Sequence, residues 1–562
     1  METGGDIDNS GTLQGGTGGN GGAVTNGSDS NGNGGKGGHG ISASGGAIIN
    51  TGAIIGGDGG ASGTDVNGGN GGDGGDGGDG IVGSNLKVVN SGSVRGSKGG
   101  APGRGTAGKD GYAIRFQGGT NILELHAGSD ISGIVWANSN GSNTFILGGD
   151  TDATFAGDMT SGVGVDGSAQ YYGFQTNEKT GTSTWSLTGR SESWTIKQGV
   201  LQIGDGGTKG EITGDVNTGL DASTKGTLAF NRSDPMLFGG LISGTGNVRQ
   251  LGGGTTVLIG NNTYSGGTIL DGGTLSVSRE ANLGDASGGL SFNGGILQIT
   301  GTTFKSTART ITWGSEGGGF DIADPNNVFT VSQNLGAGGA LTKKGAGTLV
   351  LSGTNTYKGG TTVSDGILQL GDGTTDGSIL GGVDLSGGDL VVANQDATVL
   401  DGNISGTGSV TQDGTGKLTL SGNNSYGDTY LNAGVISVEQ EEKDTYGARI
   451  SNRDGDSLTG RLGLAASYAN AWKGEDGLMV NTSVYGIANL YQEFLGDARM
   501  NYAGTHMATD SDGTWGGIGA GGTYAWADNK YAIYGEGSIN TSLNHFADSY
   551  AIKGNLGFKV KW

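Results

Sequence analysis

Two aspartates in a glycine-rich tract have the spacing of a calcium site. The run Gly74-Gly75-Asp76-Gly77-Gly78-Asp79-Gly80-Ile81 fits the nonapeptide whose turn carboxylates coordinate calcium between stacked strands. Such sites need the nine-residue period repeated in tandem, and this copy is the only complete one in the sequence. A solvated loop is therefore the favoured interpretation, and Asp76 and Asp79 are the candidate ligands if calcium binds.

A serine in the run Gly455-Asp456-Ser457-Leu458 is the one candidate nucleophile. The run spells the motif of the GDSL lipases, which also carry a partner aspartate three residues before a histidine. Neither His506 nor His545 follows an aspartate in this way. A serine nucleophile needs a positioned base, so this segment is predicted to be a polar loop.

The remaining chemistry-bearing residues do not form a site. The histidines are scattered, and no pair has metal-ligand spacing: His39, His126, His506 and His545. Gly-x-Gly-x-x-Gly matches occur throughout the glycine tracts and carry no nucleotide-binding information. The chain has no cysteine, which removes thiol chemistry. The sequence therefore predicts a protein that is not an enzyme and needs no cofactor.

Composition favours a repetitive all-β chain. Glycine occupies 129 of 562 positions, against an average of about 7%. Three prolines and no Gly-X-Y period exclude collagen. Many apolar residues are β-branched or leucine and alternate in short runs between turn residues, as in many short strands. A net charge of −22 excludes a nucleic-acid partner, because phosphate binding needs clustered cations.

The first 100 residues repeat at intervals near 40. Asn9-Ser10-Gly11, Asn50-Thr51-Gly52 and Asn90-Ser91-Gly92 mark the period, and short apolar segments flank the second and third copies. Asn and Gly accept the positive φ of tight turns. Each unit is predicted to be a strand, a turn, a second strand and a flexible glycine loop, within a region spanning residues 1–150.

A second repeat lies in the region 151–438, in copies at 244–277, 341–370 and 406–438. Each copy contains a Leu-x-Gly-x-Asn-x-Tyr-like run followed by a glycine and a short strand, with the tyrosines Tyr264, Tyr357 and Tyr426. Stacking such rungs buries a core that no single rung could bury. The tyrosines are predicted to cover the solenoid at a turn, with sugar stacking as the alternative.

These repeats resemble the passenger-associated transport repeat of type V secretion autotransporters, and the N-terminal units resemble alphaproteobacterial passengers. The resemblance implies a right-handed parallel β-helix passenger; spacing alone supports a β-solenoid.

Residues 457–562, after a short junction at 439–456, have longer candidate strands with more Tyr and Trp. They lie at 460–472, 478–494, 498–509, 514–527, 530–541 and 549–562, and each could span a bilayer. The last strand puts the apolar residues on one face: Tyr550, Ile552, Leu556, Phe558, Val560 and Trp562. This alternation is typical of lipid outside and water inside, and the terminal aromatic resembles the outer-membrane β-signal read by the barrel assembly machinery.

About six strands fall below the usual minimum of about eight for a single-chain barrel. The first residues, Met1 to Gly5, also lack the basic and apolar regions of a signal peptide. The sequence therefore predicts an incomplete antiparallel outer-membrane β-barrel in a chain shortened at its start and deleted internally.

The predicted function is that of an outer-membrane autotransporter with a surface-exposed, non-enzymatic passenger, an adhesin or surface antigen. Its expected partners are outer-membrane lipid, the barrel assembly machinery and a host cell-surface or matrix ligand. Two alternatives stay open: a non-exported fragment of a damaged gene, and a β-helix enzyme acting on polysaccharide. The enzyme alternative requires acidic and basic side chains converging on one face of adjacent rungs.

Overall fold

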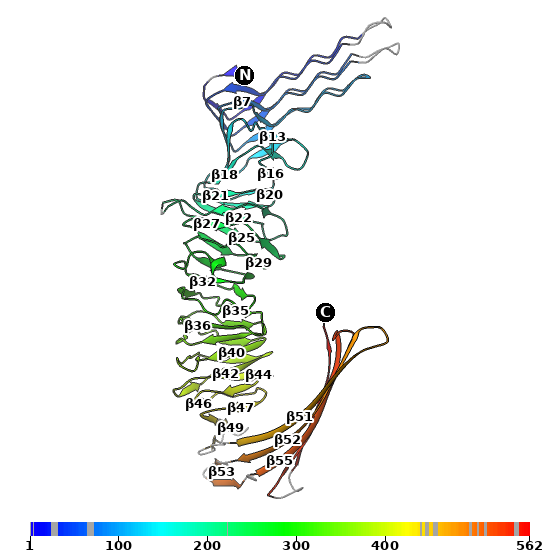
Figure 1. Cartoon of the computed structure of the whole chain (residues 1–562). Coiled ribbons are helices and arrows are strands. Elements are labelled where there is room, and N and C mark those ends of the chain that lie inside the picture. The colour runs from blue at the N-terminus through cyan, green and yellow to red at the C-terminus, as the bar shows by residue number, and fades with distance from the viewer. Residues whose placement is uncertain are drawn as a thin grey trace. The chain divides into compact units, whose positions relative to one another are not determined.

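The computed structural model describes residues 2–3, 5–23, 32–63, 72–221, 223–438, 441–443, 449–452, 459–493, 497–502, 505–510, 514–544 and 550–561. The chain forms two compact units, residues 1–348 and residues 349–562. Stacked parallel rungs, with β-strands labelled in Figure 1, make up the first unit and the start of the second. The second unit ends in antiparallel strands. The predicted all-β chain, with a β-helix followed by part of a barrel, is confirmed.

The first rungs repeat with the predicted period. Along one sheet of the first unit the strands pair in parallel in the order β2 (Ile7–Asn9), β5 (Ala47–Asn50), β8 (Lys87–Asn90), β11 (Thr120–Leu125), β14 (Ser142–Leu147), β18 (Thr176–Lys179), β21 (Trp194–Ile196), β24 (Val216–Asn217) and β27 (Ile242–Ser243). A second sheet contains β4 (Ile41–Ser44), β7 (Ile81–Ser84), β10 (Ile114–Phe116) and β13 (Val135–Ala137), and a third contains β3 (Thr12–Gln14), β6 (Ala53–Ile55), β9 (Ser93–Arg95) and β12 (Asp130–Ser132). Ile41 lies opposite Ile81 and Asn50 opposite Asn90, so the rungs follow the sequence repeat.

Later rungs of the first unit continue on two further sheets. One runs through β15 (Ala153–Phe155), β19 (Thr184–Leu187), β22 (Gly199–Ile203), β25 (Gly226–Phe230), β28 (Asn247–Gln250), β30 (Thr268–Leu270), β32 (Leu290–Phe292) and β34 (Ile311–Trp313). The other runs through β26 (Met236–Phe238), β29 (Thr255–Leu258), β31 (Thr274–Val277), β33 (Ile296–Ile299), β35 (Gly318–Ile322) and β37 (Leu341–Lys344). Inward aromatic side chains pack within this core; the rings of Phe292 and Phe320, for example, lie 5.0 Å apart.

In the second unit the rungs continue with three sets of parallel strands. Their strands, in sheet order, are β39 (Thr361–Val363), β41 (Val383–Leu385) and β44 (Ile404–Gly406); β40 (Gly366–Leu370), β42 (Gly388–Val392), β45 (Val410–Gln412) and β47 (Thr429–Leu431); and β43 (Thr398–Leu400), β46 (Lys417–Leu420) and β48 (Val435–Val438). All of these pairs are parallel, as a β-helix requires.

The asparagines of the predicted turns form a buried ladder through the first rungs. Asn9 Nδ2 donates to Asn50 Oδ1 at 2.7 Å, and Asn50 Nδ2 donates to Asn90 Oδ1 at 2.7 Å. All three side chains are buried. The sequence predicted that these asparagines lie at tight turns. The structure shows in addition that the side chain of each one bonds to the asparagine one repeat away.

Replacing Asn50 by Ala is expected to loosen the first three rungs. It leaves the Asn90 carbonyl oxygen without its amide donor and removes one acceptor of Asn9, at a cost of about 2–4 kcal/mol. Hydrogen exchange of the amides in β5 and β6 should accelerate strongly. Ser10→Ala, next to Asn9 at an exposed turn position, is the control and should leave exchange unchanged. Equal exchange in both variants would contradict a stabilising ladder.

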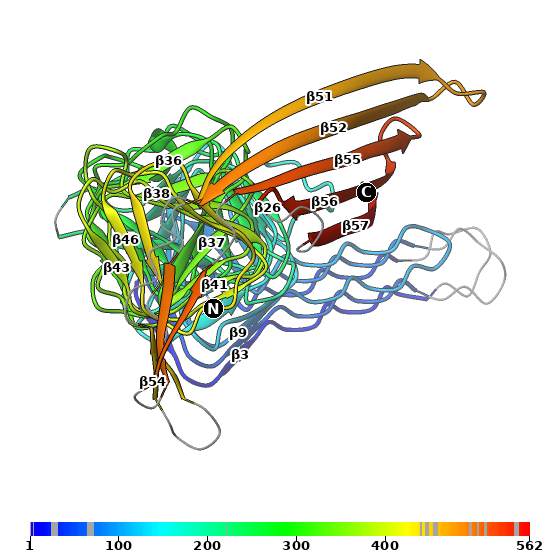
Figure 2. The same ribbon diagram turned by 90° about the horizontal axis from the view of Figure 1, so that it is seen from below.

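The glycine tracts are ordered, and the prediction of flexible loops is wrong for their described residues. Segments 15–23, 32–40, 56–63, 72–80 and 96–112 run out from the rungs as undulating arms, blue in Figures 1 and 2. Backbone hydrogen bonds recur every third residue: the amides of Gly15, Gly18 and Gly21 bond to carbonyls of the segment 55–61 at 2.7–2.9 Å. This three-residue period is that of a polyproline II helix, which has no internal hydrogen bonds and so bonds its neighbours.

Glycine is needed in these arms because the backbones nearly touch. A Cβ added at Gly18 would lie 2.0 Å from the Gly35 carbonyl oxygen, and one at Gly60 would lie 2.0 Å from that of Gly19. We call this arrangement of segments 15–23, 32–40, 56–63, 72–80 and 96–112 the glycine lattice. Gly-Gly-X triplets form it because every third residue is free to carry a side chain outward.

The long antiparallel strands form one five-stranded sheet, in the order β51 (Thr459–Lys473), β52 (Met479–Glu493), β55 (Thr514–Trp526), β56 (Tyr531–Ser542) and β57 (Tyr550–Val560). The predicted strand at 498–509 is wrong. Its residues form two short strands, β53 (Asp497–Tyr502) and β54 (Thr505–Asp510), which pair with each other and lie in a separate sheet with β49 (Glu441–Lys443) and β50 (Arg449–Asn452). Asn501 lies opposite His506 and Tyr502 opposite Thr505, so the two halves of the predicted strand pair antiparallel with each other instead of running on as one strand.

Candidate functional site

Two of the three repeat tyrosines lie inside the rungs. The Tyr264 and Tyr357 rings are buried, and each hydroxyl shares a hydrogen bond of 2.7 Å with a threonine, Thr268 and Thr361 respectively. Burial raises the pKa of both hydroxyls, so they stay protonated. Sugar stacking is therefore excluded for these two rings. Tyr426 is half-buried and bonds to Thr429 at 2.9 Å.

The three rungs that precede these tyrosines, and one earlier rung, each contain an inward side chain that hydrogen-bonds to the turn after it. These residues are Lys179, Gln250, Lys343 and Gln412, and all are buried. Gln412 Nε2 donates to the carbonyls of Gly414 and Gly416 at 2.8 and 2.9 Å. Lys343 Nζ donates to the carbonyls of Lys344 and Gly345 at 2.9 and 2.6 Å. Charged and amide side chains thus serve the same structural role, which sequence patterning did not reveal because lysine usually lies outside.

Lys179 makes the stability of its rung depend on pH. Burial lowers the pKa of Lys179 to about 8, although Asp150 and Asp152 act in the opposite direction. The unfolded chain then binds the proton more tightly than the folded chain does. Stability contributed by this site therefore rises as pH increases from about 8 towards 10.5 and is lowest below pH 8.

Lys179→Gln is expected to remove this pH dependence, because glutamine occupies the equivalent place in two other repeats. Denaturant unfolding of both proteins between pH 7.5 and 10.5 measures it. Wild type should gain stability relative to the variant across this window. Parallel curves would show that Lys179 is not the titrating group.

Asp76 and Asp79 lie in the glycine lattice and not in a solvated loop. Asp76 accepts the Lys109 backbone N–H at 3.0 Å and lies 3.2 Å from Lys36 Nζ. Asp79 is almost fully buried; it accepts the Tyr112 backbone N–H at 2.9 Å and the Arg115 Nε–H at 2.7 Å. Both carboxylates are thus already bonded to protein cations and amides.

The other candidate residues have structural partners or lie outside the description. His39 Nδ1 accepts the Asp79 backbone N–H at 3.0 Å, and His126 Nε2 lies 2.8 Å from Glu124. The segment 455–458 and His545 lie outside the described residues, as does the side chain of His506. Within the described ranges no group of three His, Cys, Asp or Glu residues could hold a metal ion.

The five-stranded sheet has one apolar face. Register places residues of all five strands opposite one another in rows, such as Leu464, Ala488, Ile518, Ile539 and Ile552. The next row on this face contains only alanine and glycine. The row after it consists of Tyr468, Val484, Gly522, Gly535 and Leu556. Leu556 is 81% exposed and Leu464 79%, so no protein covers the face within the described chain. With strands of 11–15 residues, the face is long enough to cross a bilayer.

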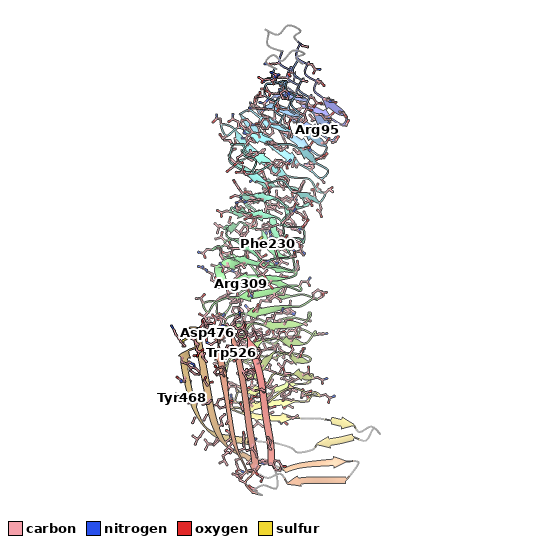
Figure 3. The ribbon with its side chains drawn as sticks, turned by 90° about the vertical axis from the view of Figure 1, so that its right-hand side faces the viewer. Arg95, Phe230, Arg309, Tyr468, Asp476 and Trp526 are labelled. Atoms are coloured by element: carbon pink, nitrogen blue, oxygen red, sulfur yellow. The ribbon has the colours of Figure 1, made fainter. Side chains whose placement is uncertain are left out.

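An aromatic cluster lies at one end of this apolar face. Its members are Trp472, Tyr524, Trp526, Tyr531 and Phe558, with neighbouring ring centroids 5.6–6.4 Å apart. Figure 3 labels Trp526 and Tyr468 on this sheet. Aromatic rings gather where membrane meets water, because they are apolar with a polar edge. This cluster was not predicted, since its residues come from four strands.

The opposite face of the sheet is polar, and on it tyrosine rings lie over glycines of the neighbouring strands. Tyr485 donates a hydrogen bond to the Glu536 carboxylate and covers Gly521, where an added Cβ would lie 2.6 Å from the hydroxyl oxygen. Tyr534 covers Gly557 in the same way. Rings lying over glycines strengthen a sheet where glycine lacks side-chain contacts.

On the last strand, Tyr550, Ile552, Leu556 and Phe558 are 58–81% exposed on the apolar face, and Val560 is half-buried. Trp562 lies outside the described residues. The expected outward face is thus present as a continuous surface with four other strands. Within the described part of the chain, no helix is both long and apolar enough to cross a membrane.

Comparison with known families finds a match in each part of the chain. The passenger-associated-transport-repeat model matches residues 178–203, 248–277, 341–370 and 410–438. Three of these matches fall within the predicted copies. The copy at 178–203 was missed because it lacks the Asn-x-Tyr run; its detectable signal is Gly199-Val200-Leu201, equivalent to Gly273-Thr274-Leu275. The Autotransporter beta-domain model matches residues 429–538.

One curated relative is the Adhesin BmaC autotransporter of Brucella suis biovar 1 (strain 1330). It is 41% identical over 120 residues, which cover 21% of this chain and 4% of the relative. The matched stretch therefore spans a small part of that relative's length. No solved structure matches the chain.

Proposed function

We propose that this chain, an autotransporter with transport repeats and a β-domain, displays a non-enzymatic β-helix passenger that acts as a bacterial adhesin. The single observation that carries this proposal is the combination, in one chain, of four passenger repeats with a β-domain match. The β-domain indicates an outer-membrane location with the passenger at the cell surface. The relative named as an adhesin supports the binding role.

The partners follow from the two surfaces. The apolar face with its aromatic end fits outer-membrane lipid, and the exposed last strand fits recognition by the barrel assembly machinery. A host cell-surface or matrix component is the proposed ligand of the passenger.

A polysaccharide-cleaving enzyme is the rival proposal, because acidic and basic side chains do converge on the glycine lattice. Asp79 is only 4% exposed and already bonds to an amide and a guanidinium. Asp76 bonds to an amide and lies beside an ammonium. A general base must be free to take a proton, so this arrangement favours binding over cleavage.

Surface display and adherence test the proposal together. Cells expressing the chain should lose the passenger when protease is added from outside, and should attach to host epithelial cells more than non-expressing cells do. Cells broken before proteolysis control for protease susceptibility. A passenger protected in intact cells would refute surface display; a displayed passenger with no gain in attachment would refute the adhesin role.

A further inference from the structure

A pocket of about 370 Å³ lies on one face of the glycine lattice. We call it the lattice pocket; its lining includes Lys36, His39, Asp76, Asp79, Lys109 and Tyr112. Three adjacent segments, 32–40, 72–80 and 106–112, provide nearly all of its wall. The volume is within the range of small-molecule sites and suits one or two sugar units.

Side chains in the lattice pocket form two rows across the three segments. One row is Lys36, Asp76 and Lys109, joined by the bonds of Asp76. The other is His39, Asp79 and Tyr112, joined by the backbone amides of Asp79 and Tyr112. The three-residue period of each segment sends every third side chain to the same side. A tightly bonded backbone thus holds the rows at fixed spacing, which lowers the entropy lost when a ligand binds.

The charges of the lattice pocket favour an anion. Asp110 is paired with Lys98 at 2.6 Å, which leaves Lys36, Lys109 and Arg115 against Asp76 and Asp79. Three cations minus two carboxylates give a local charge of +1, in a chain whose net charge is −22. The Lys36 side chain is 80% exposed, so its ammonium can move to a ligand. A single negative group would balance the pocket.

An aromatic surface lies beside these cations. The Arg115 guanidinium, held by Asp79, is 5.7 Å from the centroid of the Tyr112 ring. The Trp136 ring lies 6.3 Å from that of Tyr112, and its Nε1–H donates to the Val163 carbonyl at 2.9 Å. The Nε1–H bond holds the Trp136 ring beside the Tyr112 ring. A flat ring next to hydrogen-bonding groups suits a sugar, which has an apolar C–H face and a polar rim.

We propose that the lattice pocket binds a sugar unit carrying a carboxylate, as part of an acidic polysaccharide or glycan. The carboxylate lies against Lys36 and Lys109, and the sugar ring lies against Tyr112 beside Arg115. This inference rests on the proposed adhesin function and names the class of its ligand.

The test measures sugar binding to the full chain in detergent micelles by saturation-transfer NMR. Glucuronic acid and N-acetylneuraminic acid are the charged probes, and glucose and N-acetylglucosamine are their neutral counterparts. The acids should bind at least tenfold more tightly than the neutral sugars, and less tightly as salt increases. The double variant Lys36→Glu/Lys109→Glu should lose at least tenfold in affinity for the acids. The same two changes at exposed lysines of later turns, Lys209→Glu and Lys225→Glu together, are the charge-matched control and should leave binding normal.

Tyr112→Ala separates the aromatic contribution from charge. This variant should bind the acidic sugars more weakly and should transfer less saturation to the C–H protons of the sugar ring. Its backbone amide still bonds to Asp79, and near-ultraviolet circular dichroism checks that the lattice stays folded.

Equal binding of acidic and neutral sugars, no binding of any probe, or normal binding by the double variant would each overturn the inference. Adherence of whole cells distinguishes this failure from that of the proposed function. If the wild-type chain promotes attachment and the double variant does so equally, the lattice pocket is not the adhesive site. If the wild-type chain promotes no attachment, the adhesin role itself fails.

Discussion

Gly18→Ala is expected to disorder the glycine lattice, whereas Gly19→Ala leaves it intact. A Cβ at Gly18 would lie 2.0 Å from the Gly35 carbonyl oxygen and 2.8 Å from the Gly60 nitrogen, so two neighbouring segments would have to move. At Gly19 an added Cβ meets nothing within 4 Å. Forcing apart a packed, hydrogen-bonded backbone should cost more than about 3 kcal/mol, the upper end of ordinary overpacking.

Hydrogen exchange of the full chain measures this difference. In Gly18→Ala the amides of Gly35 and Gly60 should lose protection, together with their neighbours in segments 32–40 and 56–63. In Gly19→Ala they should exchange as in the wild type. The two variants change adjacent glycines to the same residue. A difference between them therefore reflects the close contact of the backbone segments and not the conformational preference of alanine. Equal protection in the two variants would show that the segments are not packed as described.

Leu556→Arg is expected to prevent stable insertion of the five-stranded sheet. Leu556 lies in an inner row of the apolar face, opposite Gly535 and beyond it Gly522 and Val484. An arginine on the lipid side costs about 2–4 kcal/mol near the bilayer midplane. The fraction of chain protected from protease in lipid vesicles should fall steeply.

Asn555→Arg is the matched control for that variant. Asn555 is the adjacent residue on the polar face, opposite Glu536, where an arginine meets water and a carboxylate. It should insert as the wild type does. If both variants insert equally well, the assignment of the two faces is wrong; if both fail, strand disruption and not lipid exposure explains the loss.

Local pattern was enough to predict the strands of the rungs and the two faces of the last strand. Asn50 and Asn90 mark one repeat after another, and the structure pairs them directly. Alternation along Tyr550 to Val560 defines an apolar side without knowledge of neighbouring strands. The transport-repeat matches at 248–277, 341–370 and 410–438 lie within the copies predicted from sequence.

Features that depend on distant partners could not be predicted from local pattern. Arg309 is buried although arginine usually lies at the surface, because it donates to the carbonyls of Gly284, Asp285 and Gly288. Figure 3 labels Arg309 among the rungs of the β-helix. A charge is expected outside unless its partners are known, and those partners lie about 20 residues or more away in sequence.

The sequence by itself determined that this protein is built of short repeated strands followed by membrane-type strands, because side-chain alternation and repeat period are local properties. Only the tertiary structure decided what the glycine tracts do. Glycine has no side chain to show a buried face, so the Gly-Gly-X triplets look like loops until neighbouring segments bond to them. The same packing brings Lys36, Asp76 and Lys109 together from three separate segments, and with them the lattice pocket.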